Sequence, residues 1–228
     1  MQAVFGMFDE RIKEINLYFD AIKELDNIKV NDVSKNKYFN KEFIKILKAN
    51  TLIMIYNLVE STVMGSIQEV YDKLKSEDIT YAIARKEIKD IWFSYKFNQV
   101  YDQLAHFNSY KEKALEIVNS ILLGETIELD KKATSISGNI DAQKIRNLCS
   151  EHGITFKVDK SCHGGMVLET VKNKRNELAH GTLSFAECGR DYTIGELESI
   201  KSETITFLSG FLNGIKKYYD EKGYKIRD

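Results

Sequence analysis

One short segment, VLETVKNKRNELAHG (residues 167–181), places a charged residue among apolar ones. Three apolar residues and one cation lie three or four positions apart, on one stripe of a predicted helix: Leu168, Val171, Arg175 and Leu178. The guanidinium of Arg175 stays charged at any accessible pH, so its burial is costly unless it meets an anion or an acidic partner. Two interpretations follow: an ion pair with Glu60 or Glu177 that fixes the packing, or recognition of a phosphate.

A histidine, His180, follows Arg175 by five positions and ends the predicted helix before Gly181. At about 100° per residue it lies roughly 140° around the helix from Arg175, so the two side chains would flank a groove. The alternative is a cation that interacts favourably with the dipole at the helix C-terminus. Asn176, next to the arginine, favours the chemical interpretation.

Three further charged residues are candidates for the same site. Glu60 lies on the apolar face of the second predicted helix, where it could meet Arg175 or His180, or only pair structurally. Lys172 and Lys174 flank the motif and could attract RNA phosphates, but lysines on an exposed helix face are usually only solvated. Both interpretations stay open for each residue.

Soft metal ligands occur within the segment 124–165, as Cys149-x-x-His152 and the adjacent pair Cys162-His163. Zinc sites usually present paired ligands with two to four residues between them on both sides, and this spacing does not match. We therefore expect ordinary thiols, and neither a metal nor another cofactor.

The elements that must position these residues are long helices. Proline, the strongest breaker of helix interiors, is absent from the chain. Helical periodicity and a capping box that opens the last helix predict six segments: a helix from Phe8, helices at 40–75, 81–103, 110–122 and 166–180, and a helix from Thr193 to about Tyr219. The polar stretch 26–37 separates the first two helices.

The region 124–165 differs in character from the rest. Its residue pattern predicts two short strands and a small helix between them: 125–130, 154–159 and 141–151. Ser137 or Asn139 could cap this helix, and Gly153 could end it. We interpret the region as an insert within a single domain that spans residues 1–228.

Composition excludes several classes of protein. Hydrophobic residues make up 43% and charged residues 29%, which excludes a disordered chain. The net charge of −1 excludes a uniformly basic nucleic-acid binder, so any phosphate contact must come from a local cluster. Three cysteines, the absence of a signal-peptide pattern and the absence of an apolar run of membrane-spanning length predict a cytoplasmic protein without a membrane segment.

The segment from Arg175 to His180, RNELAH, resembles the R-x(4–6)-H signature of HEPN domains, including the small polar residue that commonly follows the arginine. The chain is also similar to one bacterial branch of HEPN-like nucleases over most of its length. The similar segments are FDERIKEINLYFDAI, ILKANTLIMIYNLVESTV, SGNIDAQKIRNLCSEHGI and RNELAHGTLSFAECGRDYT. Residues 76–125 match least well.

This resemblance implies an all-α HEPN-type helical bundle, with the small α+β insert before the motif helix, that forms a homodimer with both motifs facing one cleft. It implies a metal-independent endoribonuclease that leaves 2′,3′-cyclic phosphate and 5′-hydroxyl ends. His180 of one protomer would take the 2′-hydroxyl proton, and the second His180 would protonate the leaving oxygen. Arg175 would bind the charge that develops on phosphorus, and Asn176 would be an orienting residue of the site.

The resemblance also implies a biological role, as a toxin or phage-defence effector that acts on cellular RNA. A cognate antitoxin or a nucleotidyltransferase would then be a protein partner. The main alternative is a non-catalytic HEPN module that binds RNA or a partner protein through the same cleft. A purely structural helical dimer is the third hypothesis.

Overall fold

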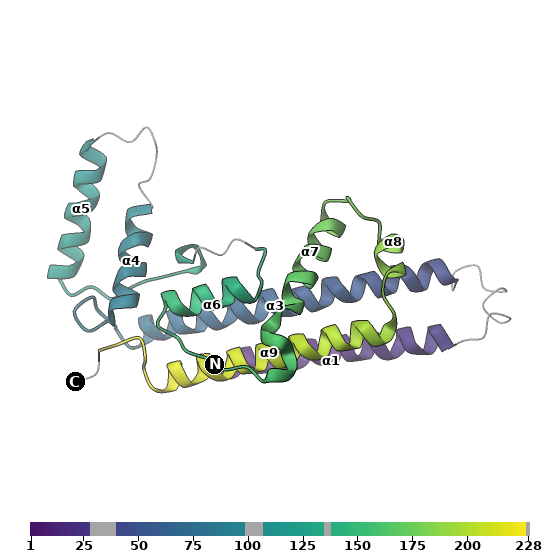
Figure 1. Ribbon diagram of the computed structural model, residues 1–228. Coiled ribbons are helices and arrows are strands. Elements are labelled where there is room, and N and C mark those ends of the chain that lie inside the picture. Colours follow the sequence, from purple (N-terminus) through teal and green to yellow (C-terminus); the bar gives the residue numbers. More distant parts are fainter. Residues whose placement is uncertain (28–39, 99–106, 135–137, 227–228) are drawn as a thin grey trace.

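The computed structural model describes residues 1–27, 40–98, 107–134 and 138–226 (Figure 1). Within these ranges the chain is predominantly helical, which confirms the predicted all-α class. No helix in the described ranges combines the length and the hydropathy that a bilayer crossing requires. The helices are α1 (Gln2–Asn27), α3 (Lys41–Ser76), α4 (Lys86–Asn98), α5 (Phe107–Leu122), α6 (Ala142–Glu151), α7 (Val167–Ala179), α8 (Phe185–Arg190) and α9 (Ile194–Asp220).

The three longest helices, α1, α3 and α9, lie side by side along the length of the molecule (Figure 1). The predicted apolar stripe of α1 is confirmed, because Phe8, Ile15 and Phe19 are buried in the core. The predicted capping box of α9 is also confirmed: Thr193 accepts from the Glu196 backbone, and the Glu196 carboxylate accepts in return. These helices form the frame on which the others pack.

The central helix α3 begins after Asn40, whose side chain accepts a hydrogen bond of 2.9 Å from the Phe43 backbone N–H. It contacts α1, α7, α8 and α9, and its buried residues extend from Ala49 to Leu74. A helix that is covered on several sides needs apolar residues around most of its circumference. The polar stretch predicted before it lies largely outside the described residues.

Helices α7 and α8 both pack on α3 (Figure 1). The predicted stripe of α7 is confirmed, because Leu168, Val171 and Leu178 are buried. Helix α8 was not predicted from the sequence. Its close approach to α3 requires Gly189, since a Cβ at this position would lie only 1.8 Å from the Lys45 carbonyl oxygen.

Two predictions for the region 124–165 are wrong in detail. Neither predicted strand forms: residues 125–130 make one isolated bridge, Thr80 to Thr126, and 154–159 pairs with no strand in the described part of the chain. The second segment runs extended along α9, where Gly210 and Gly214 leave room for its backbone. It is therefore held by helix packing.

The small helix of this region, α6, forms as predicted. Its N-cap, however, is Asp141, which accepts from the Lys144 backbone at 2.9 Å. The predicted cap Ser137 lies outside the described residues, and Asn139 makes a different contact. Gly153 has a positive φ of 68°, as expected for a residue that ends a helix.

Helices α4 and α5 form an arm that stands away from one end of the long helices (Figure 1). Helix α4 begins at Lys86, later than predicted, because Thr80 and Ala84 make bridges to other segments. The predicted end of this helix at Gln103 lies outside the described residues. Helix α5 ends at Leu122 as predicted, but it begins at Phe107, before the predicted start at Tyr110.

The packing of segment 154–158 on α9 predicts the effect of two glycine substitutions in one helix. Alanine at position 214 would bring its Cβ to 2.3 Å from the Cβ of Phe156. We expect Gly214→Ala to lower the free energy of unfolding by about 1–3 kcal/mol, measured by chemical denaturation. Gly195→Ala is the matched control, because its Cβ would meet nothing within 4 Å, and we expect unchanged or slightly higher stability. Equal stability of both variants would contradict this packing.

Candidate functional site

The predicted site lies where α7 crosses α3, and its centre is Arg175. The guanidinium carbon lies 4.1 Å from the centre of the Tyr56 ring, within range of a cation–π interaction. Its Nη2 atom lies 3.6 Å from Glu60 Oε2, a long ion pair. The arginine side chain keeps 25% of its surface exposed. The predicted contact between Glu60 and Arg175 is therefore present, and the arginine side chain stays partly exposed.

Asn176 connects Arg175 to a loop from a different part of the chain. Arg175 Nη1 donates a hydrogen bond of 2.9 Å to Asn176 Oδ1, and Asn176 Nδ2 donates one of 2.5 Å to Asn139 Oδ1. The Asn176 amide thus accepts with its oxygen and donates with its nitrogen, which fixes its orientation. This is the arrangement that an orienting residue for an arginine requires.

His180 occupies the C-cap position of α7, where its backbone N–H donates to the Asn176 carbonyl at 2.9 Å. Gly181 follows with a positive φ of 69°, so the helix ends where the sequence predicts. The imidazole is exposed, and its ring nitrogens make no hydrogen bond or ion pair among the residues that the structure describes. A histidine in this position is accessible to a substrate or to a second chain.

The two lysines of the predicted site are paired with carboxylates. Lys172 Nζ lies 2.7 Å from Asp141 Oδ2, and both side chains are only 16% exposed. Burial acts to raise the pKa of Asp141, but hydrogen bonds from Lys172 and the Lys144 backbone outweigh it and lower this pKa. Lys174 pairs with Glu177 at 2.8 Å within the same helix, and this hydrogen bond raises the lysine pKa.

The structure therefore brings together only part of the predicted set. Arg175, Asn176 and Glu60 form one contact network, whereas the His180 side chain and the two lysines lie outside it. Sequence reasoning missed two members, Tyr56 and Asn139. Tyr56 precedes Glu60 by four positions, one helical turn, which is the signal that could have identified it. No comparable sequence signal points to Asn139.

The candidate metal ligands of the sequence do not converge. Among the described residues, no three His, Cys, Asp or Glu side chains are placed to hold a metal ion. Burial raises the pKa of the Cys149 thiol to about 12, which disfavours the thiolate that binds metals. His163 is exposed and pairs with Glu203 at 3.1 Å.

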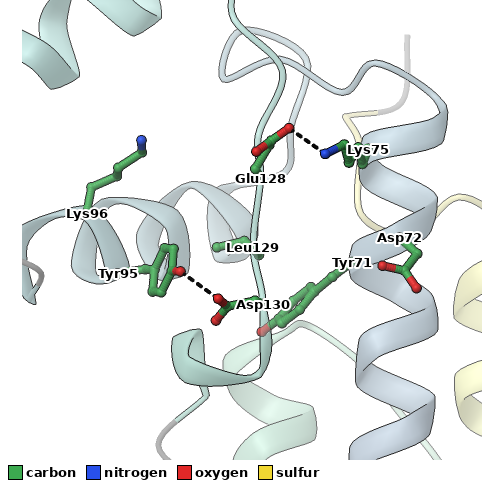
Figure 2. Close-up of a pocket in the computed structure, with 8 residues that line it drawn as sticks. All are labelled: Tyr71, Asp72, Lys75, Tyr95, Lys96, Glu128, Leu129 and Asp130. Carbon is green, nitrogen blue, oxygen red and sulfur yellow. Dashed lines mark hydrogen bonds and ion pairs between the residues drawn. The ribbon is translucent and has the colours of Figure 1, made fainter.

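A pocket of about 350 Å³ lies between α3, α4 and the segment before α6, apart from the predicted residues (Figure 2). Its charged groups largely satisfy one another. Lys75 pairs with Glu128 at 2.8 Å, and the Tyr95 hydroxyl donates to Asp130 at 3.0 Å. Because these pairs already use the polar groups at its wall, we assign no reaction to this pocket.

A buried histidine near this pocket, His152, predicts a pH dependence of stability. Its Nδ1 lies 2.7 Å from the Leu148 carbonyl oxygen and therefore carries the proton, while Nε2 accepts from the Tyr71 hydroxyl at 2.7 Å. Burial lowers the pKa of His152 below its ordinary value of 6.5. Between the folded pKa and about 6.5 the unfolded chain binds more protons, so stability falls as the pH drops below about 6.5.

We therefore expect the free energy of unfolding to decrease when the pH is lowered from about 7.5 to about 5.5. The decrease should be smaller in His152→Gln, because glutamine has no proton to gain in this range. Denaturation at several pH values measures both slopes. Identical slopes in the two proteins would contradict the role of His152.

Similarity to a known protein family identifies the family of this chain. No curated protein and no solved structure gives a match. Residues 2–224, by contrast, match the family described as MAE_28990-like HEPN. The match includes both α3 and α7, whose crossing forms the site described above. The chain therefore belongs to the HEPN family, whose domains are typically ribonucleases or bind RNA.

Proposed function

We propose that this protein is a metal-independent endoribonuclease in which Arg175 and His180 carry the reaction. The observation that supports the proposal is the pairing of an oriented, partly exposed arginine with an exposed histidine at the end of the same helix. Membership of the HEPN family supports RNA as the substrate class. Lys172 and Lys174 are proposed only as secondary contacts, since each already has a carboxylate partner.

Arg175 is suited to binding a phosphate because most of its hydrogen-bonding capacity is unused among the residues that the structure describes. A guanidinium has five N–H donors, and the contacts to Asn176 and Glu60 involve Nη1 and Nη2 only once each. Tyr56 covers one face of the planar group, so a phosphate would approach along its edge. There it would stabilise the additional negative charge that develops on phosphorus during cleavage.

The chemistry follows from the nature of RNA. One imidazole removes the proton of the 2′-hydroxyl, and the resulting oxygen attacks the adjacent phosphorus. The bond from phosphorus to the 5′-oxygen breaks, and a second imidazole, in its protonated form, gives its proton to the leaving oxygen. The products are a 2′,3′-cyclic phosphate and a 5′-hydroxyl. Histidine serves both roles because its pKa lies near neutral pH.

This reaction needs two histidines, and each chain supplies one at the motif. We therefore propose a homodimer in which the two α7 helices face a shared cleft, so that each protomer contributes Arg175 and His180. The exposure of the His180 ring in the single chain fits this assembly. We further propose that the protein acts in the cytoplasm as a toxin or defence effector, restrained by an antitoxin or a nucleotidyltransferase.

The first test is cleavage without metal. We expect the purified protein to cut RNA in the presence of EDTA and to leave ends with a 2′,3′-cyclic phosphate and a 5′-hydroxyl. His180→Ala should lower the cleavage rate by about 10²–10⁴-fold, because it removes the proton-transfer group, with an unchanged melting temperature. RNA with a 2′-deoxy residue at the cut site should resist cleavage, because the attacking group is missing. Sequencing of RNA ends reports cleavage by the wild type, its loss in His180→Ala and the resistance of the 2′-deoxy RNA.

His163→Asn is the matched control, because this exposed histidine lies before the start of α7, at the opposite end of the helix from His180, and pairs with Glu203. Asparagine tolerates the positive φ of 46° at this position. His163→Asn should keep wild-type activity. RNA binding without cleavage by the wild type, retained in both His180→Ala and Arg175→Ala, would instead favour the non-catalytic binding module.

A second test concerns the shared site. When wild-type and His180→Ala chains are coexpressed in equal amounts, about one quarter of randomly paired dimers contain two intact histidines. We expect activity per total protein to fall to about one quarter of the wild-type value, because each site needs both imidazoles. A fall to only about one half would show that each protomer acts alone and would contradict the shared cleft. Mass measurement in solution should first confirm the dimer.

A further inference from the structure

Four consecutive residues, 138–141, touch the surroundings of Arg175, although they belong to the region that we propose to be an insert. Gly138 lies beside Glu60: a Cβ atom added to this glycine would lie 3.8 Å from Glu60 Oε1. Each of the next three residues makes a polar contact. These are Asn139 with Asn176 at 2.5 Å, the Ile140 backbone N–H with the Tyr56 hydroxyl at 3.1 Å, and Asp141 with Lys172 at 2.7 Å.

Two residues of this segment have a positive φ that the capping of α6 does not require. Gly138 and Asn139 both have positive φ, 73° and 55°. Glycine adopts this region freely, whereas a residue with a side chain does so at a cost, and asparagine is among the few that tolerate it. The cap of α6 is supplied by Asp141, so capping does not explain the conformation of Asn139. Its side chain is instead directed to Asn176.

The direction of the two hydrogen bonds determines how Asn176 meets the arginine. Asn139 Oδ1 accepts from Asn176 Nδ2, so the Asn176 amide must present its oxygen on the other side. That oxygen accepts from Arg175 Nη1. If the amide rotated by half a turn, it would present N–H groups to the N–H groups of the guanidinium, and the contact would be repulsive.

We infer that Asn139 is a positioning residue for Arg175 and acts through the amide of Asn176. Its side chain contacts Asn176, and through that amide it holds the guanidinium in the orientation proposed to face the substrate. The region 124–165 therefore controls the site that α3 and α7 form. The effect on cleavage rests on the proposed function, whereas the effect on the arginine does not.

A second contact of the same segment supports this inference. The backbone N–H of Ile140 donates to the Tyr56 hydroxyl, and the Tyr56 ring lies over the guanidinium of Arg175. Ile140 itself is fully buried, so the segment is anchored in the core next to the loop residue that contacts Asn176. Segment 138–141 thus holds both the amide and the ring that contact the arginine.

The main test is Asn139→Gly, because glycine keeps the positive φ and removes only the side chain. We expect kcat for RNA cleavage to fall about tenfold, with KM and the melting temperature unchanged. Asn139→Asp keeps an oxygen acceptor and tolerates positive φ, and it should retain most of the activity. Lys222→Gly is the matched control, since Lys222 also has a positive φ, 53°, and its side chain pairs with Glu77, outside the site. Unchanged kcat in Asn139→Gly would overturn the inference.

A double-mutant cycle tests whether the effect passes through Asn176. If it does, Asn139→Gly should lower kcat no further in an Asn176→Ala background. If the double variant instead loses kcat by the product of the two separate factors, Asn139 acts independently of Asn176, which would overturn the inference.

A readout without activity separates this inference from the proposed function. In ¹⁵N-labelled protein, restricted rotation of the Arg175 guanidinium should give resolved Nη–H signals, assigned by comparison with Arg175→Lys. These signals should merge in Asn139→Gly and persist in Lys222→Gly. If the wild type cuts no RNA but shows this difference, the proposed function fails and the positioning of Arg175 by Asn139 stands. Identical arginine signals in wild type and Asn139→Gly would overturn the inference whether or not RNA is cut.

Discussion

The site depends on one constraint: Arg175, a cation, lies on a helix stripe whose other members are buried. An arginine in such a position must be surrounded by groups that replace water. The chain provides an aromatic face from Tyr56, a carboxylate from Glu60 and an amide oxygen from Asn176. Because two of these groups come from α3 and one from α7, the charge itself ties the two helices together.

This requirement extends to the packing around the crossing. Tyr56 and Glu60 are one helical turn apart, so α3 must present one face to α7 in a fixed register. The ion pair of Lys172 with Asp141, whose side chains are each 16% exposed, holds α7 against the start of α6. Helix α7 thus makes polar contacts with both α3 and the start of α6, in addition to the contacts of its buried apolar residues. A rigid support of this kind is what a preorganised catalytic arginine needs.

Most of the fold could be predicted from the sequence, because the apolar periodicity and the capping residues of a long amphipathic helix lie close together in the sequence. The stripe of α7 and the capping box at Thr193 are examples. The wrong prediction of strands at 125–130 and 154–159 has a physical cause: an apolar alternation fits any extended chain with one buried side, and the second segment packs on α9 glycines. The contact of Asn139 with Asn176 could not be predicted, since 37 positions separate them and only the folded loop brings them together.

Glu60 shows how the same network bears on the proposed reaction. Its carboxylate offsets the charge of Arg175 when no RNA is bound, and its distance of 3.6 Å from Nη2 makes this a weaker contact than the 2.9 Å hydrogen bond to Asn176. A bound phosphodiester carries one negative charge, as the Glu60 carboxylate does. Its interaction with the arginine is therefore little stronger than that of the carboxylate. The phosphorane-like transition state carries more charge and gains more from the same cation. An arginine that is partly balanced in this way favours the transition state over the bound substrate, and that difference is what accelerates a reaction.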